Sequence, residues 1–280
     1  MWAGPCTIVC VALLDQRVAH WFETHRRDLP WRRADPWGVY VSEIMLQQTP
    51  VSRVLPAWQA WIARWPTPTD LADDSLGEAI RMWGRLGYPR RAKRLHEAAV
   101  MMRDEFAGAV PDTEHDLRRL PGVGEYTAAA VAAFAYGRDS TVVDINVRRF
   151  LIRVLTGADP APTYSAAERA VISALPIDVP RPLWAAASME FGALVCTARS
   201  PACPQCPLAD LCDWVPSGSV GRTQTYEGTD RQARGAVLEM LRAGPVSEFE
   251  WHDAAQLQRA LDGLLADGLI VRDHQWSLPR

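Results

Sequence analysis

Four cysteines gathered in one proline-punctuated loop constrain the fold of this chain more than any other feature. Their spacing is Cys196-x6-Cys203-x2-Cys206-x5-Cys212. Structural zinc sites more often pair two close Cys-x-x-Cys units across a longer gap, whereas one compact loop can wrap the corners of a cuboidal cluster. Free thiols without a ligand role would be open to oxidation. The spacing therefore favours an iron–sulfur cluster, with zinc as the alternative.

The chain lacks the sequence signatures of membrane and secreted proteins. The apolar run Ile8–Leu14 has no basic segment before it and no cleavage site after it, so it predicts the start of a helix that continues through Trp21. The longest uncharged apolar run, 128–136, is far shorter than the roughly 20 residues of a membrane-spanning helix. We expect a cytoplasmic, nucleoid-associated protein of the bacterial cytosol, in which thiols stay reduced and Cys6 and Cys10 are ordinary helix residues.

Charge is balanced along most of the sequence. The net charge is −3, and of the 30 basic and 33 acidic residues, 7 and 10 lie in residues 213–280, which leaves 23 of each for residues 1–212. The chain is therefore no polycation, and any nucleic-acid surface must come from local patches.

Most of residues 15–212 predicts helices joined by short Pro and Gly turns, with few of the alternating apolar runs that indicate strands. We therefore expect an all-α fold. Asp35 followed by Pro36 predicts the N-cap and first turn of a helix that runs through Leu46. Further helices are predicted over 51–64, 76–82, 92–106, 126–136, 146–155, 166–175 and 182–195.

The composition changes after the cysteine loop. Residues 216–230 are rich in Gly, Ser and Thr and predict a linker. Residues 231–280 predict a small separate module, with helical periodicity over 231–242 and 253–266 and a hairpin over 269–278. Two helices and a hairpin favour a winged-helix-like unit, and a plain helical cap that does not touch DNA is an equally good interpretation.

A tight turn with two glycines precedes a helix of small residues in LPGVGEYTAAA, residues 120–130. Gly122 and Gly124 can adopt positive φ and leave N–H groups exposed at a helix start, where the dipole favours a phosphate. Such a turn holds a DNA strand without recognising its sequence. By itself, the pattern is weak evidence, because most Gly-x-Gly pairs are only turns.

Two carboxylates stand out from their surroundings. Glu43 lies in an otherwise apolar predicted helix, residues 37–49, and Asp144 comes just before another. A helix N-cap explains Asp144 equally well. A half-buried ion pair with Arg27 or Arg32 explains Glu43 equally well. On the residues alone, the catalytic and structural interpretations both stay open.

Six motifs follow one another along residues 20–212. They are RDLPWR (27–32), SEIMLQQT (42–49), LGYPRRAKRLH (86–96), LPGVGEYTA (120–128), VDINVRR (143–149) and the four-cysteine loop. In this order and spacing the chain resembles the helix-hairpin-helix base-excision glycosylases, and specifically the adenine DNA glycosylases of the MutY type.

The resemblance implies a two-domain architecture. A four-helix iron–sulfur domain would comprise residues 1–36 and 137–215, and a six-helix barrel with the helix-hairpin-helix would comprise residues 37–136. A [4Fe-4S] cluster held by the four cysteines would shape a DNA-contacting loop and take no part in the chemistry. We expect the linker at 216–230 and the C-terminal module at 231–280 to follow.

The resemblance also implies the chemistry. Hydrolysis of the bond between adenine and deoxyribose needs an acid for the base and a carboxylate for the cationic sugar. Glu43 would be the acid and Asp144 the stabilising or covalently trapping carboxylate, as in retaining glycoside hydrolysis. Tyr126 would position the pair with help from Asn146. Tyr126 also fills the slot of the Schiff-base lysine of bifunctional relatives, so we expect a monofunctional enzyme that leaves an abasic site.

The expected substrate is double-stranded DNA carrying adenine opposite 8-oxoguanine or guanine, bound by a monomer. The target base must leave the duplex to reach its pocket. By resemblance, the adenine pocket is lined by Leu29, Trp31, Arg32, Leu46 and Val51, the wedge beside the partner base is Gln48 and Tyr88, and the hairpin glycines are Gly122 and Gly124. Plain packing is the alternative for Leu46 and Val51. Arginines and a lysine over residues 90–94 either grip phosphates or form a solvated helix face.

Several residues depart from the family pattern. Ile145 replaces a small residue and is expected to crowd the sugar or shift Asp144. Ala186 stands where a Gln or Glu would touch adenine, and Pro89 stiffens the wedge. The tail is too short for the Nudix-like domain with which many relatives inspect 8-oxoguanine.

Two other functions remain open on the sequence. A thymine or uracil mismatch glycosylase of the same superfamily also combines Glu, Tyr and Asp, although RDLPWR and the pair Gln47-Gln48 favour adenine. A non-catalytic iron–sulfur DNA-binding or sensor protein would explain Ile145 and the short tail, but the presence of Glu43, Tyr126 and Asp144 together argues against it.

Overall fold

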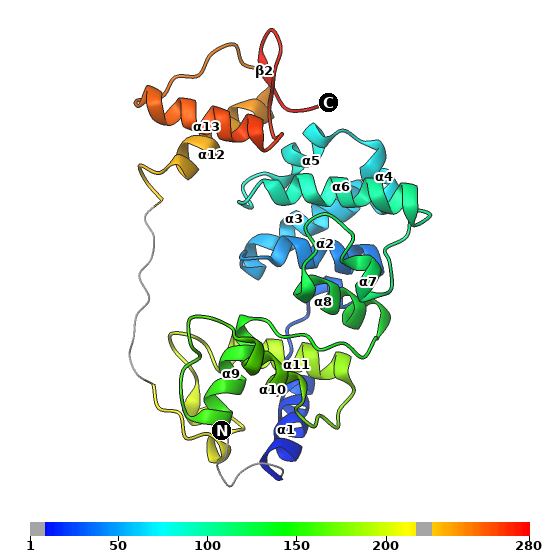
Figure 1. Cartoon of the computed structure of the whole chain (residues 1–280), viewed down its shortest axis with the longest axis vertical. Coiled ribbons are helices and arrows are strands. Elements are labelled where there is room, and N and C mark those ends of the chain that lie inside the picture. Colours follow the sequence, from blue (N-terminus) through cyan, green and yellow to red (C-terminus); the bar gives the residue numbers. More distant parts are fainter. Residues whose placement is uncertain (1–8, 217–225) are drawn as a thin grey trace. The chain divides into compact units, whose positions relative to one another are not determined.

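The computed structural model describes residues 9–216 and 226–280, which form helices and one short hairpin (Figure 1). The elements are α1 (Val9–His25), η1 (Pro30–Arg33), α2 (Pro36–Leu46), α3 (Val51–Arg64), α4 (Pro68–Asp73), α5 (Leu76–Trp83), α6 (Arg90–Glu105), α7 (Glu114–Leu117), α8 (Glu125–Tyr136), α9 (Ile145–Thr156), α10 (Ala166–Ser173), α11 (Arg181–Leu194), η2 (Cys203–Gln205), η3 (Ala209–Leu211), α12 (Asp230–Ala243), α13 (Ala254–Ala266), β1 (Val271–Arg272) and β2 (Trp276–Ser277).

The chain divides into two compact units. The first comprises residues 1–32 and 125–221, and the second comprises residues 33–124 and 222–280. The described part of the first unit holds α1, the cysteine loop and α8 to α11, whereas that of the second holds α2 to α7 and the C-terminal elements.

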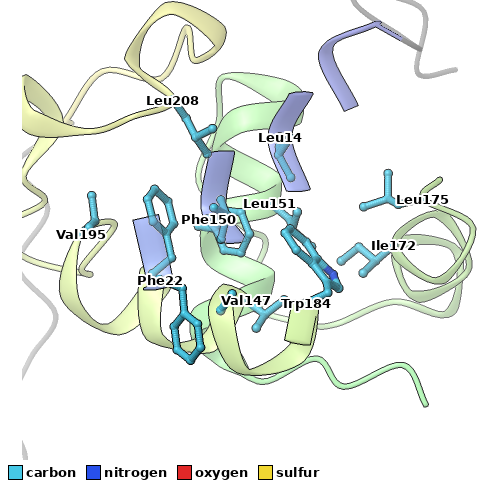
Figure 2. Close-up of a cluster of buried hydrophobic side chains, with 13 residues drawn as sticks. Leu14, Phe22, Val147, Phe150, Leu151, Ile172, Leu175, Trp184, Val195 and Leu208 are labelled. Atoms are coloured by element: carbon cyan, nitrogen blue, oxygen red, sulfur yellow. The ribbon is translucent and has the colours of Figure 1, made fainter. Parts of the chain in front are cut away.

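The first unit is built around α11, which packs against α1, α8 and α9. Its core is a cluster of buried aliphatic and aromatic side chains, drawn in Figure 2. The Phe150 ring of α9 makes edge contacts with Trp184 and Phe191 of α11, with ring centroids 6.0 and 5.4 Å apart. Such aromatic pairs add to the free energy gained by burying their apolar area. This packing fixes the N-terminal end of α9, where Asp144 lies.

The helical part of the second unit is rich in buried tryptophans. Trp61 packs edge-on against Trp65 and Trp83, with ring centroids 4.7 and 5.7 Å apart. The indole N–H of Trp58 donates to the Gly38 carbonyl oxygen at 2.8 Å. A Cβ at Gly38 would lie 2.6 Å from the Cβ of Ala34, so this close approach excludes larger residues. These contacts hold α2, the helix that carries Glu43, against α3.

The C-terminal module docks on the rest of the second unit. It consists of α12, α13 and the antiparallel pair β1–β2, and Val246 extends the sheet by a bridge to Trp276. Arg81 Nε donates to the Arg242 carbonyl oxygen at 2.9 Å, and Arg85 pairs with Glu239 at 2.8 Å. Charged contacts thus place α12 beside the loop that follows α5.

The expected all-α architecture is confirmed, as are the helix at 51–64 and the Asp35 N-cap, whose carboxylate accepts from the Gly38 N–H at 2.8 Å. The short helices α4 and α7 were not predicted from the sequence. Cys6 and residues 217–225 of the predicted linker lie outside the described residues, and Cys10 falls within α1. Among the described residues, no helix is both long enough and apolar enough to span a bilayer.

Candidate functional site

The candidate site residues divide between the two units. Asp144, Asn146 and Tyr126 belong to the first unit together with Leu29, Trp31 and Arg32, whereas the second unit holds Glu43, Leu46, Gln48, Val51, Tyr88, Gly122 and Gly124.

Asp144 is fixed by hydrogen bonds at the start of α9. Its Oδ1 accepts from the backbone N–H groups of Asn146 at 2.8 Å and Val147 at 2.7 Å, and its Oδ2 accepts from the Asn146 side-chain amide at 2.6 Å. Burial raises the pKa of Asp144, and these hydrogen bonds oppose the rise. The N-cap interpretation is therefore confirmed as geometry, and it leaves a carboxylate held in one orientation.

Ile145 lies next to this carboxylate in the first turn of α9. The residue is 73% exposed, and the N-cap hydrogen bonds of Asp144 are complete. That Ile145 crowds the sugar or shifts Asp144 relative to the family stays a prediction.

A chain of hydrogen bonds connects Asp144 to the cysteine loop. Beyond Asp144, the Asn146 amide oxygen accepts from Arg149 Nη2 at 2.9 Å. Arg149 also donates to the carbonyl oxygens of Gly192 at 2.6 Å and Cys196 at 2.8 Å. A buried arginine that satisfies several acceptors is strongly specified by its surroundings. The orientation of Asn146 therefore depends on the position of the first cysteine.

Arg27 and Arg32 bind a buried glutamate of α11 that the sequence analysis missed. The Glu190 side chain is 3% exposed, and its carboxylate accepts from Arg27 Nε at 2.9 Å and Nη2 at 2.7 Å. Arg32 Nη2 lies 3.1 Å from Glu190 Oε2. Burial disfavours the charged carboxylate, but the Arg27 hydrogen bonds and the Arg32 charge outweigh it and lower the pKa of Glu190.

This ion pair corrects the expectation that Arg27 or Arg32 of the RDLPWR segment pairs with Glu43. The arginines proposed as partners of Glu43 are held by Glu190, one helical turn after Ala186. The contact to adenine expected from a Gln or Glu at position 186 stays unassigned, because Glu190 on the same helix is bound by the two arginines. An acidic residue in the otherwise apolar stretch 183–195 was the available signal, because buried carboxylates need a cation.

The remaining predicted residues of the first unit are largely buried. Leu29 and Trp31 are buried, and Arg32 stacks over the Phe22 ring at 5.0 Å. The Tyr126 hydroxyl at the start of α8 donates to Met189 Sδ at 3.8 Å. Met189 directly precedes Glu190, so α11 contacts both the tyrosine and the arginine segment.

Glu43 lies on the buried face of α2. It is 6% exposed and follows the fully buried Ser42, whose hydroxyl donates to the Val39 carbonyl oxygen at 2.7 Å. Leu46 and Val51, at the end of α2 and the start of α3, are half-buried. A carboxyl group shielded from bulk water on an apolar helix is a candidate proton donor.

Gln48 and Tyr88 form two strained turns, residues 47–49 and 87–89, which we call the wedge segments. Both residues have left-handed backbone conformations, with φ of 57° and 49°, and the Tyr88 side chain is 53% exposed. Such conformations cost free energy in residues other than glycine and cluster at functional sites.

The buried Arg91 side chain connects the two wedge segments by hydrogen bonds. Its Nη1 donates to the carbonyl oxygens of Met45 at 2.8 Å and Gln47 at 2.6 Å, and its Nη2 donates to Thr49 Oγ1 at 2.8 Å. Burial lowers the pKa of Arg91 to about 10. Arg91 is therefore a buried structural cation, and the alternative that it grips phosphate is wrong.

The glycine turn before α8 has one glycine in the left-handed region. Gly122 has φ of 83°, and a Cβ there would lie 2.8 Å from Arg94 Cδ. Gly124 does not have positive φ, so the expectation for it is wrong. A Cβ at Gly124 would meet no atom within 4 Å, so this backbone lies open at the start of α8.

The cysteine loop fits an iron–sulfur cluster better than a zinc ion. All four thiols are half-buried and free of disulfides, and hydrogen bonds reach two of them, from Arg153 Nη1 to Cys196 at 3.6 Å and from the Leu208 N–H to Cys206 at 3.4 Å. Such donors suit the negative charge of an iron–sulfur cluster.

Comparison with known proteins identifies the class. Residues 41–176 match the HhH-GPD superfamily of base excision DNA repair proteins, and residues 196–212 match the iron–sulfur binding domain of endonuclease III. The second match confirms the predicted [4Fe-4S] cluster over zinc. With its helical fold and cysteine loop, the chain is a helix-hairpin-helix base excision repair protein of the iron–sulfur type.

Individual relatives show which family within this superfamily the chain resembles most. An adenine DNA glycosylase of Mycolicibacterium smegmatis is 51% identical over 264 residues, which cover 89% of this chain and 90% of that protein. Among solved structures, a thermostable thymine-DNA glycosylase has a TM-score of 0.64 at 26% identity over 73% of this chain and 96% of its own. An endonuclease III in a non-covalent DNA complex has a TM-score of 0.62 at 25% identity over 71% and 92%. The chain belongs to the adenine DNA glycosylase family.

Proposed function

We propose that this protein removes adenine opposite 8-oxoguanine or guanine in double-stranded DNA by hydrolysing the N-glycosidic bond, leaving an abasic site. The observation that carries the proposal is the Asp144 carboxylate, held by three hydrogen bonds at the start of α9 in a chain that is 51% identical to an adenine DNA glycosylase. A fixed carboxylate stabilises positive charge that develops on a sugar without reorganising during the reaction.

Glu43 is the proton donor in this proposal. Adenine leaves poorly as an anion, so a ring nitrogen must be protonated as the bond breaks. Glu43 is buried on α2, which shields the proton transfer from bulk water. Asp144 then faces the cationic sugar, and water attacks the anomeric carbon. Tyr126 and Asn146 position the two carboxylates, and the Asn146 amide already donates to Asp144.

The protein does not cleave the strand through an imine in this proposal. The sequence contains a single lysine, Lys93. The Lys93 amine donates to the Asp267 carbonyl oxygen at 3.0 Å in the second unit. The Schiff-base chemistry of bifunctional glycosylases needs an amine at the sugar. The position next to the glycine turn holds Tyr126, which has none. The enzyme is therefore a monofunctional hydrolase.

The other residues divide into pocket and DNA contacts. Leu29, Trp31, Arg32, Leu46 and Val51 line the adenine pocket, Gln48 and Tyr88 enter the space beside the partner base, and the open backbone at Gly122 and Gly124 contacts phosphate. The protein acts as a monomer. For the domains we keep an iron–sulfur domain of residues 1–36 and 137–215 and a barrel of residues 37–136 as a proposal. It differs from the two compact units mainly in assigning α8 to the barrel.

The test is base release from duplexes that carry A opposite 8-oxoguanine, A opposite G, T opposite G or U opposite G. The protein is compared with its Glu43→Gln variant, and borohydride is added to trap any imine. We expect adenine release that the variant lacks, with no protein trapped on DNA. Release of thymine or uracil would support the mismatch activity named for the similar thymine-DNA glycosylase, and binding without release would support a non-catalytic role.

A further inference from the structure

A cavity of about 1270 Å³ lies within the second unit, between the wedge segments and α12. Its walls include Gln48 and Tyr88 from the wedge segments, Arg94 from α6, and Tyr226, Arg231 and Trp251 from the C-terminal module. Small-molecule sites have volumes of roughly 300–1,000 Å³. This cavity exceeds that range, so it has room for a segment of a polymer.

The lining of the cavity is strongly cationic. It contains eight arginines, one of which is the buried structural cation Arg91, and a single glutamate, Glu239. Arg85 pairs with this glutamate, and Arg90 and Arg234 pair with Asp267, so part of the charge serves to dock the module. Arg94 and Arg231 are exposed on opposite walls of the cavity. A surface that neutralises phosphates with arginines is suited to a nucleic-acid backbone.

Aromatic side chains line the same cavity as the arginines. The Tyr88 and Tyr226 side chains are 53% and 55% exposed, and the indole N–H of Trp251 donates to Gln256 Oε1 at 2.7 Å. Exposed aromatic rings in a cationic groove are a platform on which unpaired bases stack. Because Gln48 and Tyr88 also border the cavity, the base that such a platform receives is the one beside the wedge segments.

We propose that this groove binds the DNA strand that carries the base opposite the excised adenine, with α12 and Tyr226 forming the wall that the barrel lacks. The proposal rests on the proposed function, since that function defines the two strands. The C-terminal module thus acts by completing a groove. Asp267 and Glu239 set its position through the arginines of α5–α6.

The test uses full-length protein in the Glu43→Gln background, so that duplexes stay intact. Arg231→Ala is compared with Arg259→Ala, which removes the same charge from α13 outside the groove, and Tyr226→Leu probes the aromatic wall. Binding to a duplex with A opposite 8-oxoguanine is measured over a range of salt concentrations. Neutral methylphosphonates then replace phosphates beside the lesion on one strand at a time, and thermal unfolding verifies each fold.

We expect Arg231→Ala and Tyr226→Leu each to weaken binding about tenfold, and Arg231→Ala to reduce the salt slope by about 1, while Arg259→Ala changes neither. Methylphosphonates on the 8-oxoguanine strand should abolish the Arg231 effect, and those on the adenine strand should leave it intact. Equal behaviour of Arg231→Ala and Arg259→Ala, or loss of the effect with adenine-strand methylphosphonates, would overturn the proposal. Adenine release by the unsubstituted protein, assayed in parallel, tests the proposed function separately.

Discussion

Arg91 donates from Nη1 to the carbonyl oxygen of Gln47 at 2.6 Å, so a buried cation closes the C-terminal end of the helix that carries Glu43. The same guanidinium lies 5.2 Å from the Trp83 ring and 5.3 Å from the Tyr88 ring. One side chain thus determines the conformation of both wedge segments.

Replacing Arg91 with Ala should lower the free energy of unfolding by about 3 kcal/mol, because buried carbonyl groups lose their donors. Arg94→Ala, an exposed change one turn later on α6, should stay within about 0.5 kcal/mol of the original protein. Denaturant unfolding of both variants measures the difference. Similar small losses in both would show that water replaces the guanidinium in the wedge segments.

Asp144→Asn separates the capping role of this residue from its chemical role. Asn caps helices about as well as Asp, so unfolding should change by less than about 1 kcal/mol. Base release should fall on the order of 10³-fold, because the charge facing the sugar is lost. Asp253→Asn makes the same exchange at the N-cap of α13, where the carboxylate accepts from the Gln256 N–H at 3.0 Å. This control should leave release unchanged, and full release by Asp144→Asn would assign Asp144 to structure alone.

Glu190 and Asp144 of the first unit should affect stability in opposite directions as pH changes. The pKa of Glu190 is lowered in the folded chain, so its stabilisation is present above its unfolded pKa and is lost as pH falls through the folded pKa. The pKa of Asp144 is raised, so its contribution is most favourable below its unfolded pKa and is lost as pH rises through the folded value.

These opposite pH dependences are tested by measuring the free energy of unfolding of Glu190→Gln and Asp144→Asn from neutral to acidic pH. Glu190→Gln should be destabilised at neutral pH and approach the original protein on acidification. The free energy of unfolding of Asp144→Asn, relative to that of the original protein, should be higher at neutral pH than in acid. A pH-independent difference for Glu190→Gln would mean that Arg27 and Arg32 do not stabilise its charge.

The cysteine loop should be needed for base release without taking part in it. Cys206→Ala should remove the visible absorption of the iron–sulfur cluster and weaken DNA binding. It should also reduce release by loosening Cys196, whose carbonyl oxygen accepts from Arg149. Cys6→Ser and Cys10→Ser are matched controls outside the loop and should retain the absorption. A Cys206→Ala protein with full release would disprove the link through Arg149.

Patterns with strong local causes were predictable from the sequence. The Asp35-Pro36 start of α2, the cysteine spacing and the hairpin at β1–β2 each follow from capping, ligand or turn chemistry within a few residues. The short helices α4 and α7 were missed, because helices of this length depend on capping and packing more than on periodicity. Glu190 was missed because its arginine partners lie 163 residues away for Arg27 and at a similar separation for Arg32. The structural role of Arg91 depends equally on carbonyls brought together by the fold.

Gly192 allows α11 to approach α9 so closely that an added Cβ would lie 2.6 Å from the Asn146 carbonyl oxygen. Changing this residue to alanine adds a single methyl group and touches no bound base. That methyl group would push against the residue that orients Asp144. An inactivating lesion in this protein can therefore begin at a helix crossing, where a screen confined to the DNA-facing surface would not look.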